Sequence, residues 1–159
     1  MIARFWLLSL AFSALAQAAA GPLSVDAILQ FREAPPGVVF EIIEPSPEQL
    51  APALFQAQTD AARLRDKFPK LPIAIVSHGR EQFALLRENA NRFEAAHRAS
   101  HALIDSGVEI SVCGVNAERR GKTAEDFMQE IDVSAEGPAR IRDLEALGYL
   151  RVRVRSAKP

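Results

Sequence analysis

Residues 38–44 read Val-Val-Phe-Glu-Ile-Ile-Glu, a mostly apolar and β-branched run between two turn-forming segments. Pro35-Pro36-Gly37 precedes this run and Pro45 follows it. A short apolar run bounded by proline and glycine is typical of a buried β-strand. We therefore expect residues 38–44 to form the first strand of the fold.

Outward from this strand, helix and strand patterns alternate along the chain. Ser46-Pro47 predicts a helix start, and apolar residues then recur at intervals of three and four as far as Phe68, just before Pro69. The β-rich apolar runs at residues 73–77 and 108–113 predict the second and third strands.

Four further elements are predicted, three helical ones from capping and stop signals and a strand from the alternation of apolar residues with arginine. They are a helical segment over residues 81–105 that stops at Gly107, a short helix capped by Thr123 and Asp126, a helix opened by Pro138, and an edge strand over residues 149–154. The helix after Pro138 is expected to bury Ile141, Leu144 and Leu147. Whether residues 82–86 form a separate turn is left open.

Strands that alternate with helices of more than ten residues favour a mostly parallel sheet covered on both faces. We expect an α/β fold, a three-layer α/β/α sandwich with about five strands, over residues 37–159. Residues 21–36 are expected to be an N-terminal extension and linker, with a short helix within residues 25–32.

Composition excludes several classes of protein. The chain has 159 residues, and 19 Lys plus Arg against 20 Asp plus Glu leave no net positive field for nucleic acid or an anionic membrane. Its single cysteine excludes an intramolecular disulfide and a cysteine-rich zinc site. Length allows one domain with a substantial core.

Residues 1–20 have the pattern of a secretory signal peptide. Arg4 precedes an apolar run at residues 5–15, and small residues follow at Ala16-Gln17-Ala18-Ala19-Ala20. The apolar run is shorter than the roughly 20 residues of a membrane-spanning helix. We expect a periplasmic or secreted protein with no stable membrane insertion after cleavage; the alternative is a retained N-terminal anchor.

Two chemically distinctive residues follow predicted strands. His78 comes after the strand at residues 73–77, and Cys113 ends the strand at residues 108–113. Ligands of open parallel sheets bind at the carboxyl ends of the strands. Cationic side chains and backbone amides lower the pKa of a thiol, and the segment after Cys113 supplies both through Gly114, Arg119, Arg120, Gly121 and Lys122.

Each candidate also has a structural interpretation. Cys113 can be a small buried apolar residue, or it can pair with a cysteine of another chain. His78 can satisfy backbone groups in its loop. His97 and His101 have the spacing of a metal pair, but no HExxH motif is present, so we expect them to be ordinary helix residues and expect no metal site. The arginines of residues 151–155 can bind anions or simply protect a sheet edge.

Four ordered motifs resemble the DsrE/DsrF-like, TusD-related sulfur-relay family. They are Val76-Ser77-His78-Gly79, Gly107 through Cys113, Arg119-Arg120-Gly121, and a closing G-x-x-x-I-x-x-L-x-x-x-G-Y segment over residues 137–149. After the cysteine this chain reads Cys113-Gly114-Val115-Asn116, where exported relatives often read C-G-N-T.

The resemblance implies a DsrE-like sandwich that assembles into homo-oligomers, commonly trimers or hexamers. It implies that Cys113 carries sulfane sulfur as a persulfide, with a small sulfur compound or a donor or acceptor protein as partner. His78 is a second candidate catalytic residue, as a hydrogen-bond partner of the thiolate or of a bound anion. A thiolate attacks sulfane sulfur without a metal or organic cofactor, so none is expected. Gly79, Gly114, Asn116, Arg119, Arg120 and Lys122 are the candidate residues for binding the ligand or anion.

A second hypothesis is a non-catalytic binding or assembly module with a ligand pocket at the strand ends. Exposure of the sulfur distinguishes the two hypotheses. A Cys113 buried among apolar groups, with the basic segment turned away, would favour the module.

Overall fold

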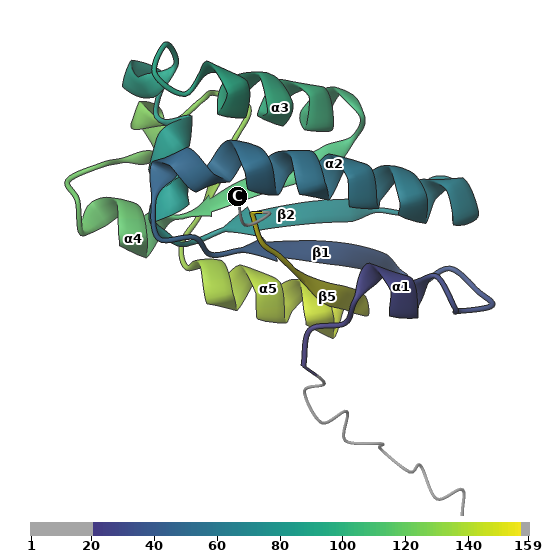
Figure 1. Cartoon of the computed structure of the whole chain (residues 1–159). Helices are drawn as coiled ribbons and strands as arrows, with labels where there is room; N and C mark the ends of the chain where they lie inside the picture. The colour runs from purple at the N-terminus through teal and green to yellow at the C-terminus, as the bar shows by residue number, and fades with distance from the viewer. Residues whose placement is uncertain (1–20, 157–159) are drawn as a thin grey trace, which may run out of the picture.

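The computed structural model describes residues 21–156, so the predicted signal peptide at residues 1–20 lies outside the described part (Figure 1). A single sheet of five strands has the order β4-β3-β2-β1-β5, and every neighbouring pair is parallel. The strands are β1 (Gly37–Ile42), β2 (Ile73–Ser77), β3 (Val108–Cys113), β4 (Asp132–Ser134) and β5 (Tyr149–Val154).

The described residues also form five α-helices and four short 3-10 helices. The α-helices are α1 (Val25–Ile28), α2 (Leu50–Lys67), α3 (Glu94–Asp105), α4 (Gly114–Glu118) and α5 (Gly137–Ala146). The 3-10 helices are η1 (Pro47–Gln49), η2 (Arg80–Leu85), η3 (Arg87–Asn89) and η4 (Ala124–Asp126). None of the helices in residues 21–156 is long and apolar enough to cross a membrane.

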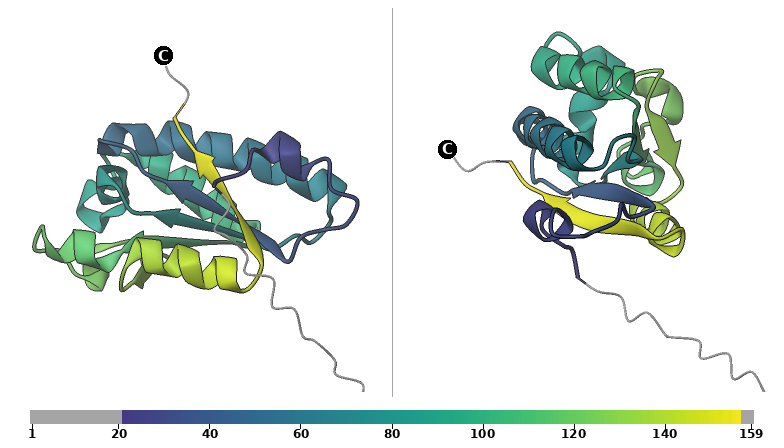
Figure 2. Two further views of the ribbon diagram at one scale, coloured as in Figure 1. Left: turned by 90° about the horizontal axis from the view of Figure 1, so that it is seen from below. Right: turned by 90° about the vertical axis from the view of Figure 1, so that its right-hand side faces the viewer.

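The direction in which the chain moves across the sheet decides which face each helix covers. From β1 to β2 to β3 the chain steps the same way, and right-handed crossovers then place α2 and α3 on the same face. The step from β4 to β5 runs back across the whole sheet, which places α5 on the opposite face. Figures 1 and 2 show α2 and α3 on one side of the sheet and α5 on the other. The predicted three-layer α/β architecture is confirmed.

The two faces of the sheet differ in how they are buried. The main core lies under α2 and α3 and includes Phe40, Ile75 and Ile110. The α5 face has a small apolar cluster of Val39, Ala74, Val76, Ile141 and Leu144. Because one ten-residue helix covers that face, polar side chains of the strands remain beside it.

The N-terminal extension is part of the domain. The backbone N–H of Leu23 donates to the carbonyl of Arg151 at 2.8 Å, and Val25 and Ile28 of α1 enter the main core. An ion pair of 2.5 Å between Arg63 and Asp26 joins α2 to α1. The predicted helix within residues 25–32 is therefore present but shorter.

Several sequence predictions need correction. Only the second half of residues 81–105 is α-helical, because η2 and η3 precede α3. The helix predicted after Thr123 is a single 3-10 turn, since the backbone of Met128 donates to the carbonyl of Leu85. Strand β4 and helix α4 were not predicted. Leu147, predicted as buried, follows α5 and is 68% exposed.

Candidate thiol site at the carboxyl ends of β2 and β3

The structure brings His78 and Cys113 together around the first residue of α5. Ser77 and Val112 are register partners, so the next residues, His78 and Cys113, lie side by side. A Cβ placed on Gly137 would lie 2.5 Å from the Cβ of His78 and 3.3 Å from the Cβ of Cys113. Glycine at position 137 is what allows α5 to approach both side chains.

The segments that leave the neighbouring strands β3 and β4 also diverge next to Cys113. The segment from β3 to β4 packs on the α2 and α3 face, where Phe127 forms an isolated bridge with Leu86. The segment leaving β4 forms α5 on the opposite face (Figure 2). Such divergence at the carboxyl ends of parallel strands produces the crevice in which ligands bind.

The thiol itself is covered. Cys113 is free, and the residue is 5% exposed. The segment between β4 and α5 lies over this region, because the backbone N–H of Val115 donates to the carbonyl of Ala135 at 3.1 Å. A Cβ on Gly114 would lie 3.0 Å from the carbonyl oxygen of Ser134. Residues 134–137 are therefore among the segments that enclose Cys113.

The side chain of Gln82 fixes the backbone of Cys113. Its Oε1 accepts from the backbone N–H of Cys113 at 3.0 Å, and its Nε2 donates to the carbonyl of Cys113 at 3.2 Å. Gln82 is fully buried in η2, directly after the loop that carries His78. This pair of bonds joins the end of β3 to the segment that follows β2.

A row of polar side chains extends from His78 across the sheet. His78 Nε2 lies 3.0 Å from Glu41 Oε1, and Arg153 Nη1 donates to Glu41 Oε2 at 2.9 Å. The hydrogen bond from His78, followed by the contacts from Arg153, holds the pKa of Glu41 at about 2, although burial opposes this shift. Glu41 is therefore ionised, and Nε2 of His78 carries the proton because a carboxylate only accepts. Nδ1 remains as the nitrogen that can take a proton.

Sequence reasoning missed Glu41 and Arg153 as site residues. A signal was present, because Glu41 is the only charged residue among the six of β1 and that strand is buried throughout. A buried carboxylate needs a partner. The sequence did not show which partner, since Arg153 lies 112 residues away.

Glu81 is a second buried carboxylate, and it organises the loops beside the site. Its Oε2 accepts from the backbone N–H of Glu44 at 2.7 Å. Its Oε1 accepts from Ser77 Oγ at 2.7 Å and from the backbone N–H of Gly79 at 2.9 Å. Burial raises the pKa of Glu81, against the effect of these hydrogen bonds.

Gly79 and Asn116, both predicted to bind the ligand, make structural contacts in this loop. Asn116 Nδ2 donates to the carbonyls of Gly79 at 2.7 Å and of His78 at 3.3 Å. A Cβ on Gly79 would lie 2.2 Å from Glu81 Oε2. Asn116 therefore ties the segment after β3 to the loop that holds His78.

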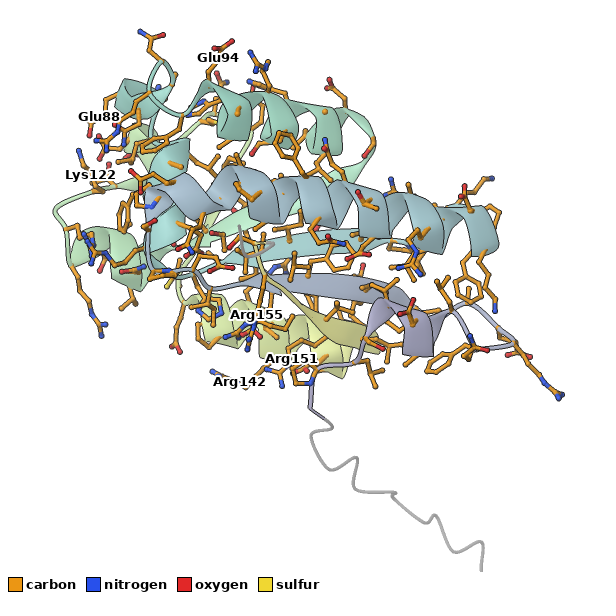
Figure 3. All side chains as sticks on the ribbon, viewed as in Figure 1. Glu88, Glu94, Lys122, Arg142, Arg151 and Arg155 are labelled. Atoms are coloured by element: carbon orange, nitrogen blue, oxygen red, sulfur yellow. The ribbon has the colours of Figure 1, made fainter. Side chains whose placement is uncertain are left out.

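The structure does not bring the basic segment to the thiol. Arg120 lies over the ring of Phe83 at 4.7 Å, and Lys122 pairs with Glu88 at 2.7 Å, which raises the pKa of Lys122. Both contacts are with residues from the 3-10 helices before α3. Figure 3 shows Lys122 beside Glu88, away from α5. Arg119 is exposed.

Histidines 97 and 101 lie in different surroundings on α3. His97 is buried and its Nε2 lies 2.9 Å from the carbonyl of Ala84, whereas His101 is exposed. Within residues 21–156 no group of three His, Cys, Asp or Glu side chains is arranged to hold a metal ion.

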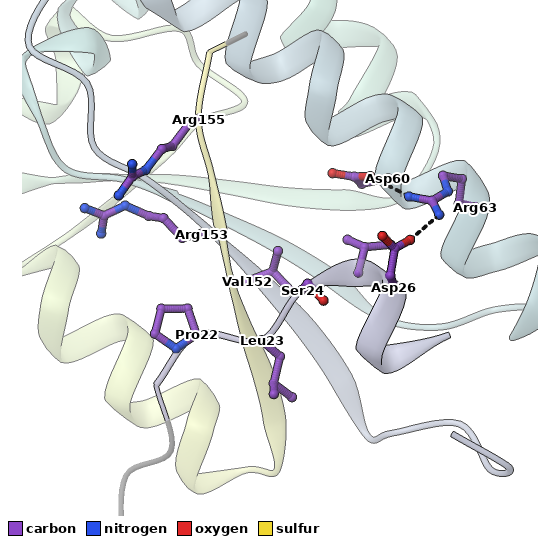
Figure 4. A pocket seen from close by; sticks show the side chains of 10 residues that line it. Pro22, Leu23, Ser24, Asp26, Asp60, Arg63, Val152, Arg153 and Arg155 are labelled. Atoms are coloured by element: carbon purple, nitrogen blue, oxygen red, sulfur yellow. Dashed lines mark hydrogen bonds and ion pairs between the residues drawn. The ribbon is translucent and has the colours of Figure 1, made fainter. Parts of the chain in front are cut away.

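An open pocket of about 460 Å³ lies on the outer side of β5, between the N-terminal extension and α2 (Figure 4). Arg63 is held there by Asp26 and Asp60. Arg153 also lines this pocket, so the polar row that begins at His78 reaches solvent through it.

Replacement of Gly137 by alanine is expected to disturb the site. The new Cβ would overlap His78, so α5 or the imidazole must shift, at a cost of about 1–3 kcal/mol. Loosening this cover should increase the rate at which an alkylating reagent modifies Cys113. The control is Arg142→Ala on the exposed side of α5, and equal rates for the two variants would contradict the prediction.

Comparison with known proteins gives the fold. No protein-family model matches the chain, and no curated protein matches its sequence. Its structure is similar to that of MTH1491, a protein of unknown function from Methanobacterium thermoautotrophicum, with a TM-score of 0.59 and 19% sequence identity. The similarity covers 73% of this chain and 96% of MTH1491. The chain is thus an α/β protein that shares the fold of MTH1491.

Proposed function

We propose that this protein is an exported, DsrE-like homo-oligomeric sulfur carrier that binds or transfers sulfane sulfur as a persulfide on Cys113. The single observation that carries the proposal is the juxtaposition of Cys113 with His78, whose imidazole is oriented by the ionised Glu41. The motif resemblance and the divergence of connections at this point of the sheet support it.

The chemistry requires no added oxidant. The thiol of Cys113 gives its proton to Nδ1 of His78, and the thiolate attacks the outer sulfur of a persulfide donor. The new S–S bond forms as the bond within the donor breaks, and the donor leaves as a thiolate that takes up the proton. With thiosulfate as donor, sulfite is the leaving group. The persulfide on Cys113 then passes its outer sulfur to an acceptor thiolate in the same way.

A second candidate function is a non-catalytic binding or assembly module. The burial of Cys113 favours it, together with the engagement of Arg120 and Lys122 elsewhere. The neighbours of Cys113 favour the carrier, because they include His78 and the first turn of α5 as well as apolar groups.

Intact-mass measurement after incubation with thiosulfate or polysulfide tests the proposal. We expect the protein to gain sulfur that cyanide removes, Cys113→Ser to gain none, and His78→Ala to load at least about tenfold more slowly because proton transfer is lost. His101→Ala is the matched control, since this histidine is exposed on α3, and it should load normally.

An adduct that persists in Cys113→Ser, or no adduct at all, would contradict the carrier. If Cys113→Ser in addition keeps the oligomeric state and alkylation of the protein is slow, the module is the better description.

A further inference from the structure

The outer edge of β3 is open along its first half. β4 pairs with β3 at Ser111, Val112 and Cys113, so within residues 21–156 the part of β3 before Ser111 has no neighbouring strand on that side. Strand backbones alternate in direction, and the N–H and C=O of Cys113 point to Gln82, on the β2 side. The N–H and C=O groups of Val108 and Ile110 therefore face the β4 side. The register of Ser111 with Asp132 engages the C=O of Ile110 with the N–H of Asp132, which leaves the N–H and C=O of Val108 and the N–H of Ile110 at the open edge.

A groove of about 490 Å³ runs beside this edge. On the α3 face its lining is apolar and comes from Ile104, Val108 and Ile110. On its other side the lining includes the charged residues Glu109, Glu130, Asp132 and Arg140. Arg140 lies 3.4 Å from Glu109. The other two carboxylates of the lining, Glu130 and Asp132, have no ion-pair partner among the lining residues.

We propose that this groove binds an extended segment of a partner protein whose side chains alternate between apolar and basic. The segment would add to β3 as a parallel strand in line with β4, through the N–H and C=O of Val108 and the N–H of Ile110. Its apolar side chains would pack on Ile104, and its basic side chains would face Glu109 and Glu130. The site lies at the opposite end of β3 from Cys113 and does not depend on the proposed function.

The opposite edge of the same sheet already contains a strand of this kind. In β5, Val152 and Val154 enter the main core, whereas Arg151 and Arg153 lie on the α5 face and pair with Glu145 and Glu41. A segment with the same alternation would place its apolar side chains against the apolar lining of the groove beside β3 and its basic side chains against the carboxylates. The chain's own matching segment is already paired with β1, so the occupant is a segment of another protein.

The test uses a synthetic peptide with the sequence of residues 150–155, Leu-Arg-Val-Arg-Val-Arg, capped at both ends. We expect it to bind the purified protein and to slow amide hydrogen exchange at Val108 and Ile110 by at least about tenfold. A matched peptide with glutamate in place of arginine should bind at least about tenfold more weakly. The Glu109→Lys/Glu130→Lys protein should lose affinity for the arginine peptide to the same extent.

Backbone methylation separates strand addition from simple charge attraction. Methylating the peptide nitrogens that face β3 should abolish binding, whereas methylating the alternate nitrogens should leave it unchanged. Binding without protection of Val108 and Ile110, or equal binding of the glutamate peptide, would overturn the proposal. So would protection that rises with protein concentration in the absence of peptide, because a second copy would then cover the edge.

Discussion

Replacing Glu81 by alanine is expected to lower the free energy of unfolding by about 3–5 kcal/mol, since it leaves two buried donors and one half-buried donor without an acceptor. These donors are the backbone N–H groups of Glu44 and Gly79 and the hydroxyl of Ser77. Glu81 is fully buried, so water cannot replace the carboxylate without entering the core. Chemical denaturation at neutral pH measures the effect.

Two matched variants show whether the acceptor geometry is responsible. Glu81→Gln keeps one acceptor oxygen, but it sets an amide N–H₂ against one donor, so we expect a loss of about 1–2 kcal/mol. Glu88→Ala removes an exposed carboxylate paired with Lys122 and should change stability by less than about 1 kcal/mol. Equal effects of Glu81→Ala and Glu88→Ala would refute this role for Glu81.

Acidification should reveal the contribution of Glu41. Its pKa is 4.5 in the unfolded chain and about 2 in the folded protein, so the unfolded chain takes up the proton first as the pH falls. The stabilisation is therefore complete above pH 4.5 and is lost as the pH falls toward 2. The shift corresponds to at most about 3 kcal/mol.

Glu41→Gln should remove this part of the pH dependence. We expect the variant to be less stable than the wild type by about 2–3 kcal/mol at pH 7 and the difference to shrink toward zero near pH 2. Burial raises the pKa of Glu81, which acts in the opposite direction, but Glu81 is present in both proteins and its effect cancels.

The control for Glu41 is Glu145→Gln, which weakens the pair with the neighbouring Arg151. That pair is more exposed, so its removal should cost less than about 1 kcal/mol. A difference between wild type and Glu41→Gln that stays constant from pH 7 to pH 2 would show that the carboxylate is not held ionised by His78 and Arg153.

Local patterns in the sequence were sufficient for most of the architecture. Three strands and the helix that ends before Pro69 were predicted from apolar patterns and turn residues, because strands buried on both faces leave a continuous apolar signal. The fourth predicted strand, β5, was recognised by the alternation of apolar residues with arginine. β4 was not predicted, because it has only three residues and only one of them, Val133, is apolar. Residues 81–93 were predicted wrongly because they begin with the 3-10 helices η2 and η3, in which the side chains of Glu81 and Gln82 accept from the backbone N–H groups of Glu44 and Cys113.

The sequence by itself determined the alternation of strands and helices and placed His78 and Cys113 at strand ends. Only the tertiary structure decided that these two residues are neighbours, that Glu41 and Arg153 complete their polar row, and that Lys122 contacts Glu88 instead of approaching the thiol. The reason is physical. Periodicity and turn residues report local burial, whereas strand order and the face chosen by each crossover bring together side chains that are far apart in the chain.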